Sequence, residues 1–192
     1  MKKVKPENIR NITVSGRIGS GATTLAKNIA QKLHWEVMEG GDLFEKFHQK
    51  LGVHQTEASK RPDSFDIAFE NRMKQLLREK EHQVFQSHLA GFNAQGIKGI
   101  YKILIVCNDK QNRDQQTVRM NRVIKREKIS LEEAKYDVLE REKQNLEKYR
   151  RLYADSDKTW VYWDKKYYDL VVNTYKLNQN EALDFVLKHL AR

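Results

Sequence analysis

The chain has 192 residues, of which 39% are hydrophobic and 32% are charged, and its formal net charge is +10. This length suits one well-packed domain, and no run of about 18 apolar residues predicts a membrane span. The N-terminal stretch "MKKVKPENIRNITVSG" is charged and lacks the apolar centre of a signal peptide. We therefore expect an intracellular, cytoplasmic protein without a membrane partner.

The positive charge and the single cysteine set further bounds. A basic surface attracts nucleic acid, acidic proteins or phosphorylated small molecules, and it also occurs as a solvated surface without a specific partner. The net charge alone does not discriminate among these classes of partner or exclude a surface without one. Cys107 cannot form an internal disulfide, and its apolar run "YKILIVCN" predicts a buried structural thiol.

Five short apolar runs, rich in β-branched and aromatic residues, alternate with helical sequence. This alternation predicts an α/β fold with a mostly parallel sheet. The runs are "IRNITVS" (9–15), "WEVMEG" (35–40), "HQVFQS" (82–87), "YKILIVCN" (101–108) and "YDLVVNT" (168–174).

The predicted helices lie between and after these strands. Apolar residues at helical spacing follow the first strand, and further helices are expected at 42–51 and at 64–80. Ser130 and Glu133 form a capping box that opens a helix reaching about Tyr149, and Asn178 opens a similar C-terminal helix. Residues 113–166 are highly charged, so we interpret 1–192 as one domain with a lid-like helical insertion at 113–166.

The stretch "GRIGSGATT" after the first strand has the glycine spacing of a phosphate-binding P-loop, G-x-x-x-x-G-K-[ST]. Such glycines let the backbone wrap phosphates at a helix N-terminus. Thr23 stands at the position of the Mg²⁺ ligand, which predicts Mg²⁺ with ATP as cofactor if the chain is active. The predicted phosphate-binding residues are Gly16, Gly19, Ser20, Gly21, Thr23 and Thr24.

Ala22 stands where the P-loop lysine belongs. That ammonium offsets phosphate charge, and losing one preorganised donor of this kind costs about 3–4 kcal/mol in the transition state. Arg17 is the one cation inside the loop and thus the candidate replacement. We expect Arg17 to point to solvent instead.

With these motifs, residues 11–190 resemble the cytidylate kinases, in particular the compact type common in archaea. The most specific pieces are "GGDLFEKF", "HLAGF", "VIKREKISLEEAKYDVLEREKQNLEKYRRLY", "YDLVVNT" and "LNQNEAL". The resemblance implies a P-loop nucleoside monophosphate kinase fold, with a five-stranded parallel sheet of order 2-3-1-4-5 and a mobile arginine-bearing lid. It also implies phosphoryl transfer from ATP-Mg²⁺ to CMP or dCMP.

The resemblance also implies site residues, and several of them differ here. Asp42 matches the family's acceptor-site aspartate, but Glu45 replaces an arginine beside it. "QSHLAG" stands where the family has an acid and a phosphate-binding arginine. The implied acceptor-binding residues of this chain are therefore Asp42, His88, Arg141 and Asn145.

In the predicted lid, the implied catalytic residues are Arg122, Arg126 and Arg141. Arg119, Arg122 and Arg126 share one helix face, and either clamp phosphates or form a solvated surface. Asn145 replaces a family acid. Lys148 replaces an arginine and loses its planar fork.

Two other groups carry a structural and a functional interpretation. His88 is either a hydrogen-bonded structural group, which we favour, or a catalytic one. An aromatic cluster precedes the last strand, and we expect it to pack the lid's return segment against the core rather than to stack bases. Its members are Trp160, Tyr162, Trp163, Tyr167 and Tyr168.

Three functional hypotheses follow. The first is a degenerate cytidylate-kinase-like protein with weak or no phosphoryl transfer and at most weak nucleotide binding. The second is an active nucleoside monophosphate kinase with a lysine-less loop and an altered acceptor. The third is a basic module for RNA, a ribosome or an acidic macromolecule, based on the segment around Arg113–Lys128.

Overall fold

The computed structural model describes residues 9–49 and 62–191, with side chains omitted at 47–49. Five parallel strands form one sheet of order β2-β3-β1-β4-β5, which confirms the predicted topology. In the sheet centre, Val14 pairs with Gln86 on one side and with Ile103 on the other. The strands are β1 Asn11–Gly16, β2 Glu36–Glu39, β3 Gln83–Gln86, β4 Ile100–Val106 and β5 Leu170–Asn173.

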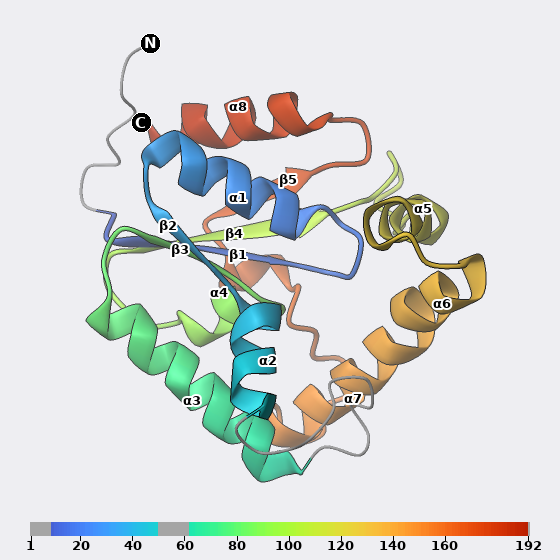
Figure 1. Cartoon of the computed structure of the whole chain (residues 1–192), viewed down its shortest axis with the longest axis horizontal. Helices are drawn as coiled ribbons and strands as arrows, with labels where there is room; N and C mark the ends of the chain where they lie inside the picture. The colour runs from blue at the N-terminus through green and yellow to red at the C-terminus, as the bar shows by residue number, and fades with distance from the viewer. Residues whose placement is uncertain (1–8, 50–61, 192) are drawn as a thin grey trace.

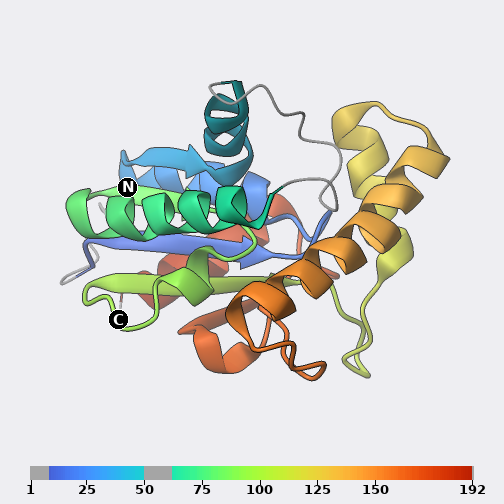
Figure 2. The same ribbon diagram turned by 90° about the horizontal axis from the view of Figure 1, so that it is seen from below.

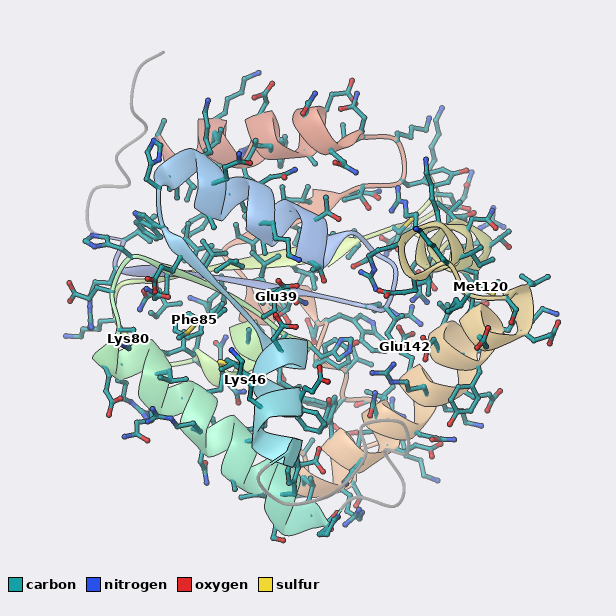
Figure 3. All side chains as sticks on the ribbon, viewed as in Figure 1. Glu39, Lys46, Lys80, Phe85, Met120 and Glu142 are labelled. Atoms are coloured by element: carbon teal, nitrogen blue, oxygen red, sulfur yellow. The ribbon has the colours of Figure 1, made fainter. Side chains whose placement is uncertain are left out.

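Helices cover both faces of the sheet (Figure 1). Helices α1 (Ala22–Leu33) and α8 (Gln179–Leu190) pack on one face, where the apolar side chains of β1 lie. Helix α3 (Asp63–Glu79) packs on the other face against Phe85, which Figure 3 shows between the sheet and that helix. The main core therefore lies between the sheet and the α1–α8 layer.

Local sequence accounts for most of these elements. The side chain of Asn178 accepts hydrogen bonds from the N–H groups of Asn180 and Glu181, which confirms the capping box of α8. Helix α2 (Gly40–Gln49) covers the described part of the helix expected at 42–51, and residues 50 and 51 lie outside the described residues. The four-residue helix α4 (Ala90–Asn93) was not predicted from the sequence.

The charged insertion forms a helical hairpin beside the carboxyl ends of the strands (Figures 1 and 2). It contains α5 (Gln116–Glu127), α6 (Leu131–Lys135), the π-helical turn η1 (Tyr136–Arg141) and α7 (Glu142–Tyr153). Ser130 caps α6 as predicted, with its hydroxyl accepting from the N–H of Glu133 at 3.3 Å. Val123, Ala134 and Val138 form a small core between the two arms of the hairpin.

The segment after the hairpin contains the short 3-10 helix η2 (Lys165–Tyr167) and leads to β5. Trp160 and Tyr162 are buried against Leu89 and Tyr149, so this part of the aromatic cluster packs the return segment on the core as expected. Among the described residues, no helix combines the length and the apolar composition of a membrane span.

Candidate functional site

The loop from Gly16 to Ala22 joins β1 to α1 and forms the centre of the site. Gly19 and Gly21 have φ values of +75° and +101°, a backbone region that favours glycine. A side chain at Gly19 would also collide with the carbonyl group of Arg119. No side chain caps α1, so the N–H groups of its first turn are available to an anion.

Two cavities of 500 Å³ each flank this loop. The first, which we name the loop–α8 cavity, lies between the loop, α1, α5 and the start of α8. The second, the loop–α3 cavity, lies between the loop, α2, α3, the end of β3 and the lid. Gly19, Gly21 and Arg126 line both cavities, so the loop and one lid arginine separate two neighbouring spaces.

The structure brings most of the predicted phosphate-binding residues to these cavities. Thr24 lines the loop–α8 cavity, whereas Gly16 and Thr23 line the loop–α3 cavity. Ser20 differs: its side chain is buried, lines neither cavity, and its Oγ has no hydrogen-bond partner in the described part of the chain. Ser20 thus contributes backbone to the loop but no hydroxyl to either cavity.

The expectation that Arg17 points to solvent is wrong. Its side chain is 22% exposed and forms ion pairs with Glu142 and, at 3.1 Å, with Asp114. The guanidinium also lies 4.5 Å from the ring centroid of Trp163. Two carboxylates and an aromatic ring therefore hold Arg17, which lines the loop–α3 cavity together with Ala22.

Glu142 links the lid to the loop. It is the first residue of α7, and Figure 3 shows it between that helix and the loop. Its carboxylate accepts hydrogen bonds from Arg17, from Arg119 at 2.9 Å and from the N–H of Ile18 at 3.1 Å. One carboxylate thus ties three groups together, two of which belong to the loop itself.

The three lid arginines have different surroundings. Neither the phosphate clamp nor the solvated surface predicted for their helix face describes all three. Arg119 is fully buried and donates to the carbonyl oxygen of Ile18 at 2.6 Å. Arg122 donates to Ser20 O at 3.3 Å and to Thr174 Oγ1 at 2.9 Å. Both hold loop backbone, whereas Arg126 is about half exposed and pairs only with its neighbour Glu127 among the described residues. Of the three, Arg126 is the one that lines both cavities, whereas Arg122 lines the loop–α8 cavity while bonded to Ser20 and Thr174.

The predicted acceptor residues separate into two groups. His88, Arg141 and Asn145 line the loop–α3 cavity. Asp42 is exposed on α2 and is not among the residues that line it, and the same holds for Glu45. The charge reversal at Glu45 therefore lies outside this cavity, and among the described side chains of α2 it is Phe44 that lines it.

His88 has structural hydrogen-bond partners. Its Nδ1 lies 3.0 Å from Gly16 O and 3.4 Å from the hydroxyl of Tyr162. Burial lowers the pKa of His88 below its ordinary value, although the contact with Gly16 O and the charge of Glu142 oppose this shift. A neutral ring that fixes the start of the loop fits the structural interpretation, and the same ring also forms part of the cavity wall.

Sequence reasoning missed the acidic residues around the site. Glu142 and Asp114 hold Arg17 of the loop and Arg119 of α5, while Asp66 and Glu70 lie on the wall that α3 contributes to the loop–α3 cavity. Asp66 pairs with Lys148 of α7 at 2.5 Å. The i, i+4 spacing of Asp66 and Glu70 was the available signal, since it places both on one helix face.

Comparison with known proteins agrees with the resemblance found in the sequence. Residues 11–176 match the model of the "Cytidylate kinase-like family". The chain belongs to this family. It is 31% identical over 179 residues to a cytidylate kinase of Methanosarcina mazei, covering 91% of this chain and 93% of that protein. It is 33% identical over 171 residues to a cytidylate kinase of Thermococcus kodakarensis, covering 88% of this chain and 81% of that protein.

Solved structures show the same fold at lower identity. An uncharacterized protein from Eubacterium ventriosum superposes with a TM-score of 0.66 at 18% identity, covering 94% of this chain and 98% of that chain. A shikimate kinase from Bacteroides thetaiotaomicron superposes with a TM-score of 0.59 at 15% identity, covering 95% of this chain and 99% of that chain. The architecture is therefore that of the P-loop kinases.

Proposed function

We propose that this chain is a cytidylate-kinase-like nucleotide-binding protein whose phosphoryl transfer from ATP to a nucleoside monophosphate is weak or absent. The loop–α8 cavity would take the triphosphate nucleotide, and the loop–α3 cavity would take the acceptor. Two cavities that share the glycines of one phosphate loop support this arrangement, because in-line transfer requires donor and acceptor on either side of the transferred group.

The observation that carries the reduced activity is the environment of Ala22. Residue 22 is buried at the start of α1 and brings no charge, and Arg17 is held by Glu142 and Asp114. Arg119 and Arg122 donate to loop carbonyl groups. No described cation inside the loop thus replaces the lysine, and the transition state loses about 3–4 kcal/mol of stabilisation, or roughly 10²–10³ in rate.

The residues present fit Mg²⁺ bound together with nucleotide phosphates. Thr23 lines the loop–α3 cavity, and a hydroxyl is a suitable oxygen ligand for Mg²⁺. In the described part of the chain, no group of three or more His, Cys, Asp or Glu side chains could hold a metal ion. Thr23 would therefore hold the ion mainly alongside substrate oxygens, where Mg²⁺ offsets phosphate charge.

A second candidate is an active kinase in which a lid arginine takes over the role of the lysine. The observation in its favour is Arg126, which lines both cavities and has one side-chain partner, Glu127, among the described residues. A guanidinium at this junction can contact phosphate oxygens bidentately. This candidate predicts clear turnover that is lost in Arg126→Ala.

The nucleic-acid hypothesis receives less support from the arrangement of charges. Arg119 and Arg122 face the loop, and Arg113 pairs with Asp109 at 2.8 Å. The segment Arg113–Lys128 therefore offers less free positive charge than its composition predicts. We propose no RNA site on this segment.

The test is a coupled ADP-release assay with ATP-Mg²⁺ and each common nucleoside monophosphate, together with isothermal titration of the same nucleotides. Our proposal predicts measurable binding with little or no turnover. Ordinary turnover on CMP or another monophosphate would overturn the weak-activity proposal and favour the second candidate. Absence of any nucleotide binding would overturn both.

A further inference from the structure

Glu70 occupies an unusual position on the wall of the loop–α3 cavity. Glu70 is 6% exposed, and it lines the cavity next to Phe69. Phe44 lies edge-on to Phe69, with ring centroids 5.1 Å apart, and Tyr149 lines the same cavity. Aromatic side chains and a buried carboxyl group thus line the same cavity, an environment that suits a flat, partly polar ligand.

Glu70 also differs from the other carboxylates of this cavity in its partners. Asp66 pairs with Lys148 at 2.5 Å, and Asp137 pairs with Arg141 at 3.1 Å. Glu70 forms no ion pair with any described residue: its Oε2 accepts from the amide of Asn93, and its Oε1 has no hydrogen-bond partner among them. Because Glu70 lines the cavity, its Oε1 can accept a hydrogen bond from a ligand there, and hydrogen bonds to charged groups are among the stronger ones.

The cavity offers cations on the lid side and a carboxyl group without an ion-pair partner on the α3 side. Arg126 and Arg141 come from the lid, where Glu127 and Asp137 pair with them, whereas Glu70 belongs to α3. A molecule with a phosphate at one end and a hydrogen-bond donor at the other matches both ends. A nucleotide whose base carries an exocyclic amino group has this form.

We propose that Glu70 is a specificity-determining residue that selects the acceptor base, its free carboxyl oxygen accepting a hydrogen bond from the amino group of cytosine. This inference rests on the proposed binding of a nucleoside monophosphate in the loop–α3 cavity. Uracil differs from cytosine at this position by a carbonyl oxygen, which an ionised carboxylate repels. The carboxylate therefore favours CMP over UMP, two ligands of almost equal size and equal phosphate charge.

The same contact makes the preference depend on pH. Burial raises the pKa of Glu70 to about 7, opposed by the hydrogen bond from Asn93, and Asp66 adds to the rise. Lys74 on α3 acts in the opposite direction, and Tyr153 of α7 also lies within electrostatic range of Glu70. Since a bound amino group stabilises the ionised form, CMP affinity rises with pH through this range. Protonated Glu70 can donate to the uracil carbonyl, so the CMP-to-UMP preference is larger at pH 8 than at pH 6.

The experiment measures the dissociation constants of CMP and UMP by isothermal titration at pH 6 and pH 8 with the full chain. The natural protein should bind CMP about 10- to 100-fold more tightly than UMP at pH 8, as expected for one buried hydrogen bond to a charged group. Glu70→Gln should remove most of this preference and its pH dependence. Glu79→Gln, an exposed change at the end of the same helix, should leave both unchanged.

Each outcome decides the inference. Equal affinity for CMP and UMP at pH 8, or an unchanged preference in Glu70→Gln, would overturn the role of Glu70 while nucleotide binding itself stands. If the natural protein binds ATP but neither monophosphate, or binds no nucleotide, the inference fails together with the proposed acceptor site. If Glu70→Gln does not fold, the pH dependence of the preference in the natural protein decides the question. A constant preference would then reject the proposal.

Discussion

Replacing Glu142 with alanine tests whether the lid carboxylate holds the phosphate loop. The side chain of Glu142 is 5% exposed, and that of Arg119, its main partner, is 0% exposed. Burial works against the charge of Arg119, but Glu142 and Asp114 together raise the pKa of Arg119 above its ordinary value. Removing Glu142 leaves this guanidinium buried with Asp114 as its remaining acidic partner at 2.7 Å.

Removing one partner of a buried ion pair costs about 3–5 kcal/mol of stability. Because Asp114 remains, we expect a loss near the lower end, about 3 kcal/mol, in the free energy of unfolding by urea. Glu140→Ala is the matched control, since Glu140 is an exposed residue of the same lid segment, and it should change stability by less than about 0.5 kcal/mol. A loss below about 1 kcal/mol in Glu142→Ala, comparable to an average surface change, would refute the reasoning.

The remaining predictions concern the lid arginines and the cysteine. Arg126→Ala should weaken ATP binding about tenfold or more while leaving the free energy of unfolding nearly unchanged, because its side chain is half exposed. Arg122→Ala should instead lower the free energy of unfolding by about 1–3 kcal/mol, since it removes hydrogen bonds to Ser20 and Thr174. Isothermal titration with ATP and urea unfolding of both variants separate the two roles. Cys107 should resist alkylation by a thiol reagent at pH 8 until the protein unfolds, because it is 1% exposed and burial raises the pKa of its thiol. Rapid labelling of the folded protein would contradict this.

Local patterns were sufficient to predict most of the fold. The strand around Leu104 is a nearly continuous apolar run, as expected for a parallel strand whose two faces are covered. The capping boxes at Ser130 and Asn178 depend on neighbours three residues away. The short helix α4 was missed because four residues carry no helical period.

The site was predictable only where it is local. The spacing of the loop glycines identifies the loop in the sequence. The direction of the Arg17 side chain, however, depends on Glu142, which lies 125 positions away in the chain. Glu70 appeared as one more charged residue on a helix with a polar face. Its burial accompanies a hydrogen bond from Asn93 of α4, which lies 23 positions away, and no local pattern encodes that contact.

The most direct test of the central claim is the rate of ADP release with ATP-Mg²⁺ and CMP, compared between the natural protein and Ala22→Lys. We predict nucleotide binding but little or no turnover in the natural protein. Ala22→Lys should bind ATP more tightly, yet turnover should stay absent because His88, Asn145 and Lys148 also depart from the family's acceptor site. Ordinary turnover by the natural protein would contradict the claim, because it would show that a loop with Ala22 still supports phosphoryl transfer.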